Sequence, residues 1–235
     1  MALGTTLSSA LDVSTTAGVQ NLPFTAGGLT ATDALIGSGS LTICVMSYHH
    51  DYSNNAPTQD GDHTQIKTYF GEGSGTQRPT LAIEDSTGAI NTIYAENSGN
   101  DDDAVLMNIT TDGSVSWDTI RGDIDTVGTS RRDDDTIYLS AIYSRKVSGR
   151  GSDVFTDNRR CYFVFDLSGM NATRTYVDAT LKLNCDNLGH TNDDFGKIIA
   201  VQATALEGKT TDYGNCFAAP VVTVTDNATF FGANF

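Results

Sequence analysis

Alternating apolar and polar positions between Arg159 and Cys185 predict two β-strands joined by a turn. Every second side chain of an extended chain points to the same face. Four apolar residues share one face of the first strand: Cys161, Phe163, Phe165 and Leu167. Four more share one face of the second strand: Val177, Ala179, Leu181 and Leu183. Ser168, Gly169 and Asn171 supply the turn between them, so both strands can contribute to one core.

This stretch resembles a known family. Over about residues 157–185, the chain resembles the early strands of DNRLRE-type jelly-roll domains. The resemblance lies in an arginine, an aromatic strand ending in FDLSG and a following strand that reads VDATLKL. Those domains are related to carbohydrate-binding modules, and they occur in secreted bacterial proteins and in virion proteins of tailed phages. The resemblance implies a β-sandwich that binds or assembles, usually without a catalytic centre.

Three earlier segments also have strand patterns. Residues 41–48 are apolar on both faces and predict a buried strand, and strands are expected at 65–70 and 80–84. This region resembles the closing strands of the same family, although here it precedes the segment that resembles the opening strands. The resemblance lies in a buried strand, a loop with Ala-Pro, and then the segments TQIKTYF and RPTLAI. Three arrangements fit this order: a circularly permuted sandwich, two separate small lobes, or strands exchanged between subunits.

The rest of the chain predicts more strands and no helix longer than about two turns. Strand character appears at residues 91–95, 104–120, 137–143, 197–206 and 221–225. Asp112-Gly113 lies between alternating runs and predicts a β-hairpin, with Trp117 on the returning strand. The predicted fold class is all-β: a jelly-roll β-sandwich with an inserted β-hairpin, in which permuted or subunit-exchanged strands are open alternatives.

The predicted organisation is one sandwich with extended ends. Residues 1–30, rich in Thr, Ser, Gly and Ala, are expected to form an extended N-terminal arm rather than a helix. The sandwich spans residues 31–235 and comprises first-half strands (41–84), an inserted hairpin region (88–128), second-half strands (136–225) and a C-terminal tail (226–235). We expect the aromatic residues of this tail to dock on the protein's own core or on a neighbouring subunit.

Charge and cysteine usage limit the classes of partner. With 29 acidic and 14 basic residues, the chain has a formal charge of −15, which opposes binding to nucleic acid or to an anionic membrane. The first residues lack a secretory-signal pattern, so we expect assembly inside the producing cell, with removal of a leader as the alternative. The four cysteines are far apart. They predict free, buried thiols, with a disulfide between Cys161 and Cys185 as the alternative.

Candidate catalytic or metal-binding residues are few. His49, His50 and Asp51, with His63 beyond the next loop, could in principle bind a metal or act as a base. Adjacent residues of a strand point to opposite faces, however, and the known hydrolase and nucleotide-binding motifs are missing. No catalytic, cofactor-binding or metal-binding residue is therefore assigned, and no enzyme activity is expected.

Two kinds of ligand remain open. The oxygen-rich loops at 100–103, 133–135 and 186–194 could hold a structural calcium ion, although solvated turns are the simpler interpretation, and no other cofactor is expected. A sugar would need exposed aromatic side chains. The candidates are Tyr48, Tyr52, Tyr69, Trp117 and Tyr213, for all of which we favour a packing role.

The predicted function is that of a structural virion protein of a tailed bacteriophage, either a capsid decoration (cement) protein or a head or tail appendage. We expect a homo-oligomer, specifically a trimer, that docks on other virion proteins such as the major capsid protein. The protein would be assembled in the host cytoplasm and would reside in the virion. The alternative is an extracellular carbohydrate-binding module or the receptor-binding part of a phage spike, with a surface glycan as partner.

Overall fold

The computed structural model describes residues 6–12, 18–58, 63–70, 77–96, 103–112, 114–122, 126–132, 138–148, 154–190, 197–203 and 210–217. The strands are β1 (Leu11–Asp12), β2 (Gly18–Pro23), β3 (Ser40–Ser47), β4 (His63–Tyr69), β5 (Thr80–Asp85), β6 (Ile90–Tyr94), β7 (Asp103–Thr110), β8 (Ser130–Arg132), β9 (Tyr138–Ser148), β10 (Val154–Asp166), β11 (Tyr176–His190) and β12 (Lys197–Gln202). The helical segments are α1 (Ala26–Asp33), a π-helical turn η1 (Tyr48–Tyr52), α2 (Trp117–Arg121) and a 3₁₀ helix η4 (Thr210–Phe217). The predicted all-β class is confirmed.

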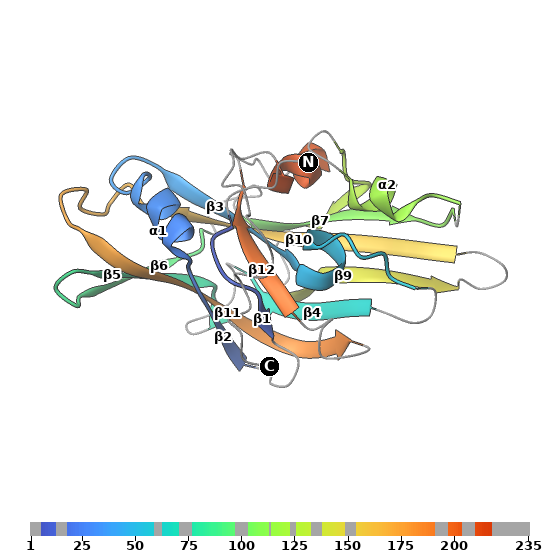
Figure 1. The fold of residues 1–235 in the computed structure, drawn as a ribbon, viewed down its shortest axis with the longest axis horizontal. Helices are drawn as coiled ribbons and strands as arrows, with labels where there is room; N and C mark the ends of the chain where they lie inside the picture. Colours follow the sequence, from blue (N-terminus) through green and yellow to red (C-terminus); the bar gives the residue numbers. More distant parts are fainter. Residues whose placement is uncertain are drawn as a thin grey trace.

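The strands form one antiparallel network that is arranged in two layers (Figure 1). In the first layer, β10 lies between β7 and β3, and β12 and β1 continue beyond β3. In the second layer, β11 has β2 on one side and β5 and β4 on the other, with β6 beyond β5. β9 joins the layers, because it pairs with β4 and with residues 154–159 of β10, whereas residues 161–166 of β10 pair with β3.

Side chains of both layers meet in one hydrophobic core. Phe163 and Phe165 of β10 and Leu181 and Leu183 of β11 are fully buried there. Phe70, directly after β4, packs on Phe163 with ring centroids 5.5 Å apart. Full burial of such a side chain contributes about 1.5–3 kcal/mol, so the two strands that the sequence pattern predicted are central to the stability of the fold.

The early strands complete the sandwich within the same chain. β3 lies between β10 and β12, and β4 lies between β9 and β11, so strands from both halves alternate in each layer. This order rules out two separate lobes. β3 is buried on both faces, as predicted, because a second apolar cluster covers the outer face of its layer under η4. Figure 1 shows η4 and α2 on the same side of β7.

Val177 departs from the predicted alternation. The pairing of β11 with β5 shifts register between Tyr176 and Asp178, which marks a β-bulge. As a result Tyr176 is buried and Val177 is 50% exposed. The prediction that Val177 shares the core face of β11 is therefore wrong, and the regular alternation begins at Ala179.

The hairpin predicted around Asp112-Gly113 is also wrong. β7 pairs with β8, and the short helix α2 lies between them, beginning at Trp117. The Ser116 side chain accepts a hydrogen bond from the backbone N–H of Thr119 and so caps this helix. Ile120 on α2 is buried. Capping and burial favour a helix here over the returning strand that the alternation suggested.

The N-terminal residues do not form an extended arm throughout. Leu7 and Leu22 are fully buried in the main core, β2 pairs with β11, and α1 begins within the predicted arm. Thr25 caps α1 by accepting a hydrogen bond from the N–H of Gly28. A Cβ at Gly28 would lie only 2.3 Å from the carbonyl oxygen of Leu7, so the helix packs against this backbone through a residue that has no side chain. The segment is part of the sandwich.

The cysteines follow the prediction only in part. Cys161 and Cys185 are free and buried, as expected, but Cys44 is disulfide-bonded. Burial raises the pKa of Cys185 to about 12 and raises that of Cys161 well above its ordinary value, so neither thiol forms a reactive thiolate near neutral pH. No helix in the described part of the chain has the length and apolar character needed to cross a membrane. The predicted strand 221–225 and tail 226–235 lie outside the described residues.

Thiol counting tests this cysteine assignment. With two free cysteines and four cysteines in the chain, we expect two thiols per chain to react with Ellman's reagent after denaturation without reductant, and four after reduction. In the native protein neither thiol should react, because both are buried. Four reactive thiols before reduction would show that the Cys44 disulfide does not form.

Candidate functional site

A buried ion pair between Arg160 and Asp51 lies at the centre of the candidate site. Arg160 lies on β10 where that strand changes partner from β9 to β3, and Asp51 lies in the turn η1 that follows β3. The Arg160 Nε atom donates to Asp51 Oδ2 at 2.6 Å, and its Nη2 atom donates to Oδ1 at 2.7 Å. Both side chains are fully buried, so this is a two-pronged pair shielded from water.

The remaining donors of Arg160 hold two other segments. Its Nη1 atom donates to the carbonyl oxygen of Tyr213 in η4, and its Nη2 atom donates to that of Arg121 in α2, both at 2.6 Å. The guanidinium also lies over the Tyr213 ring, 4.2 Å from the centroid. Burial alone would lower the pKa of Arg160, but the Asp51 charge, its hydrogen bonds to Arg160 and the nearby Tyr213 and Tyr162 together more than offset this, so the pKa lies above its usual value. Arg160 therefore stays charged and fastens η1, α2 and η4 to the first layer.

A chain of neutral hydrogen bonds extends from the same place. Ser144 donates to the Asn158 side-chain oxygen at 2.6 Å, and the Asn158 amide donates to the Tyr213 hydroxyl at 2.7 Å. That hydroxyl donates in turn to the carbonyl oxygen of Ile120 at 3.1 Å. Burial raises the pKa of Tyr213, so its hydroxyl keeps its proton. Each member is buried and bonded, which fits a structural network better than a reactive centre.

Two of the histidine candidates, His49 and His50, lie in the turn η1. His50 is buried, and its Nδ1 atom lies 2.8 Å from the carbonyl oxygen of Asn55, while the His49 ring meets it edge to face. Asp51 is engaged by Arg160. Among the described residues, no group of three or more His, Cys, Asp or Glu side chains is placed to hold a metal ion. His49, His50 and Asp51 lie in the turn η1 and not on an extended strand, so the alternation of strand side chains does not apply to them.

The proposed calcium loops fall mostly outside the described residues. Residues 100–102, 133–135 and 191–194 lie outside the described residues. For residues 186–190 only the backbone is described. Asp103 is described: it begins β7 and is buried. The structural calcium ion stays an untested prediction.

Most of the aromatic candidates are packed. Tyr213 is fully buried, and Tyr48 and Tyr52 stack on each other with centroids 5.8 Å apart beside the second apolar cluster. Trp117 begins α2 with its ring near His50. Packing is therefore confirmed for these four. Tyr94 on β6 was not among the aromatic candidates from the sequence, yet its side chain is 48% exposed. The only sequence feature that could have indicated it is the moderately apolar strand INTIY.

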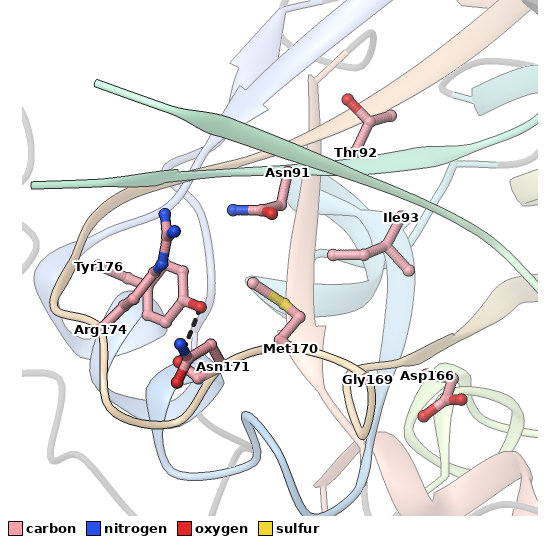
Figure 2. Close-up of a pocket in the computed structure, with 9 residues that line it drawn as sticks. All are labelled: Asn91, Thr92, Ile93, Asp166, Gly169, Met170, Asn171, Arg174 and Tyr176. Carbon is pink, nitrogen blue, oxygen red and sulfur yellow. Dashed lines mark hydrogen bonds between the residues drawn. The ribbon is translucent and has the colours of Figure 1, made fainter. Parts of the chain in front are cut away.

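A hollow with a volume of about 440 Å³ lies at one end of the sandwich, and its lining residues are drawn in Figure 2. Asn91 and Ile93 of β6 form one wall, and Met170, Asn171 and Tyr176, from the β10–β11 connection and the start of β11, form the other. The Tyr176 hydroxyl donates to the carbonyl oxygen of Asn171 at 3.0 Å and so braces the connection. The lining also includes the charged residues Asp166 and Arg174.

Asp85 fixes the neighbouring turn. Its carboxylate accepts hydrogen bonds from the side chain and backbone of Thr87 and from the backbone of Ala89, and it forms an ion pair with Arg174 of the β10–β11 connection. The Thr87 hydroxyl is the largest of the influences that hold the pKa of Asp85 far below its usual value. The ionised carboxylate thus ties the β5–β6 turn to the wall of the hollow.

Comparison with known families and proteins gives no relative. No family model, no curated protein and no solved structure matches this chain. The resemblance to DNRLRE-type jelly rolls stays a prediction from the sequence, and any functional assignment rests on the geometry.

Proposed function

We propose that this protein is a non-enzymatic structural protein that works by associating with copies of itself, as a virion component of a tailed phage. The observation that carries the proposal is the free edge of β6. Among the described strands β6 pairs only with β5, and four of its five residues are exposed. An uncovered strand edge presents unpaired N–H and C=O groups, which are a template for another strand.

The residue composition of the β6 edge favours pairing with another strand, because the edge lacks the features that usually prevent such pairing. Natural edge strands are usually protected by charge, proline or a bulge, and the β6 sequence INTIY contains neither a charged residue nor proline. Ile90 is 63% exposed, and the exposed Val177 lies on the adjoining part of β11, across β5. Pairing of the β6 edge with a strand edge of a neighbouring copy would cover these groups and join the second layer of one copy to the next.

The virion assignment draws on the resemblance and on charge. A formal charge of −15 keeps a densely packed protein soluble and disfavours binding to nucleic acid. The Cys44 disulfide suits an oxidising environment, which a released particle meets outside its host. A trimer that docks on a major capsid protein is the form of assembly that we favour.

Replacing Ile90 with lysine tests the edge. A lysine on a free edge disfavours pairing with a second edge, so we expect Ile90→Lys to shift the purified protein from oligomer to monomer in sedimentation velocity. Because Ile90 is exposed, the melting temperature should stay within a few degrees of the parent protein's. Val127→Lys, at a site that is 56% exposed between α2 and β8, is the matched control and should leave the oligomer intact.

A parent protein that is monomeric at high concentration would contradict the proposal, and so would an Ile90→Lys protein that assembles normally.

A further inference from the structure

The hollow whose lining residues are drawn in Figure 2 lies where the first layer stops short of the second. β7 pairs with β10 only as far as Phe163, so no described strand continues the first layer beside residues 164–166 on that side. After β6 the chain returns to β10, because the N–H of Glu96 donates to the carbonyl oxygen of Val164 at 2.9 Å. β6 therefore borders a gap between the layers as well as having a free edge.

The inner face of β6 is uncovered beside this gap. Asn91 and Ile93 lie opposite two residues of β5 that are fully buried in the core, so their side chains point to the same inner face. Asn91 is nevertheless exposed and Ile93 only half-buried. Ile93 packs on the rim of the main core, and so does Met170 of the opposite wall. The hollow is thus an unfilled part of the sandwich with an apolar floor.

The charged groups of the lining already have partners. Arg174 forms an ion pair with Asp85, and the Asp166 carboxylate accepts a hydrogen bond from the backbone N–H of Ser168 at 2.8 Å. Both charges are satisfied without a charged ligand. An uncharged segment in a strand conformation suits the hollow and the adjoining edge, since it can fill the first and pair with the second.

The chain contains such a segment after the helix η4. η4 ends at Phe217, and residues 218–235 follow it. Within them, residues 221–225 read VVTVT, in which Val222 and Val224 alternate with threonines. Valine and threonine favour strands, and the run is uncharged and has the same length, five residues, as β6. Paired with β6, it would place two valines on the inner face and two threonines on the outer face.

The reach of the chain favours the segment of a neighbouring copy. η4 packs on the outer face of the first layer over the second apolar cluster, whereas β6 belongs to the second layer (Figure 1). Packed layers are about 10 Å apart, so about 20 Å separate η4 from the layer of β6. The four residues from Phe217 to Val221 span at most about 14 Å when fully extended. The segment therefore reaches the β6 edge of a second copy more readily than its own.

We propose that residues 221–225 of one copy add to the β6 edge of the next copy as an extra strand, with Val222 and Val224 in the hollow. This inference rests on the proposed self-association through β6 and names the segment that β6 receives. Each copy gives one strand and receives another through different surfaces. Such a head-to-tail contact can close into a ring of three, whereas pairing of identical edges stops at two copies. The contact thus accommodates the trimer that we favour.

Paired substitutions in the full chain test which face of the segment enters the hollow. Val222→Asp/Val224→Asp would bury two carboxylates on the apolar floor, so we expect association to weaken about tenfold or more in sedimentation velocity. Thr223→Asp/Thr225→Asp adds the same charge to the outer face of the same segment and should leave the oligomer intact. Far-UV circular dichroism of both variants should match the parent's, which separates loss of the contact from loss of the fold.

Mixing two variants tests the head-to-tail contact. Val222→Asp/Val224→Asp retains a working β6 edge, and Ile90→Lys retains a working segment. Each should be monomeric alone. Together they should form a one-to-one heterodimer, because one contact can form and it cannot be extended. Native mass spectrometry with one variant isotopically labelled measures this product.

An oligomer that survives Val222→Asp/Val224→Asp would overturn the inference. Equal loss of the oligomer in Thr223→Asp/Thr225→Asp, or no heterodimer on mixing, would also overturn it. If Ile90→Lys is monomeric while the valine variant assembles, β6 is still the contact and only the donated segment is wrong. If Ile90→Lys assembles normally, the proposed self-association through β6 itself fails.

Discussion

Asp51→Asn should lower the free energy of unfolding by about 3–5 kcal/mol. The change keeps the size of the side chain but removes the charge that compensates Arg160, which is fully buried. Arg121 would lose the same compensation, because its Nε atom lies 3.8 Å from Asp51 Oδ1. Since burial already lowers the pKa of Arg121, its guanidinium depends on that neighbouring carboxylate. Urea unfolding followed by circular dichroism measures the effect.

The matched control is Asp33→Asn at the end of α1, where the side chain is exposed. It should change stability by no more than about 0.5 kcal/mol. The double variant Asp51→Asn/Arg160→Met should be clearly less destabilised than the sum of its single changes, because it removes both charges. Equal stability of Asp51→Asn and Asp33→Asn would show that the buried pair does not hold the segments together.

Leu22→Ala should destabilise the protein by about 2–5 kcal/mol. Leu22 lies on β2 opposite Leu181 of β11, and both side chains are fully buried in the main core. Truncation leaves a cavity that the surrounding sheet can fill only in part. Thermal and urea unfolding measure the loss of stability. If residues 1–30 formed an extended arm, the substitution would not lower the stability.

Val19→Ala on the same strand is the control, since Val19 is 51% exposed. It should alter stability by about 0.5 kcal/mol or less. If Leu22→Ala and Val19→Ala were equally mild, β2 would not be part of the folded sandwich.

The sequence predicted the fold best where one side-chain period persists along a strand. β10 and most of β11 follow such a period, and β3 is apolar on both faces because both faces are covered. The sequence failed where tertiary structure decided the outcome. Val177 turns outward because a bulge shifts the register, and Trp117 starts a helix because Ser116 caps it and Ile120 finds a buried place.

The candidate sites were harder to predict from sequence than the fold. Asp51 and Arg160 are 109 residues apart, and only the return of β3 beside β10 brings them together. Each residue alone has no pattern that marks it as half of a buried pair.

The most direct test of the proposed assembly is amide hydrogen exchange of β6 at two protein concentrations. If copies associate through this edge, the amides of residues 90–94 should exchange more slowly at the higher concentration, while the amides of β12, in the other layer, stay unchanged. Ile90→Lys should remove the difference. Exchange at β6 that is independent of concentration, in a protein that sediments as an oligomer, would place the interface elsewhere and contradict assembly through β6.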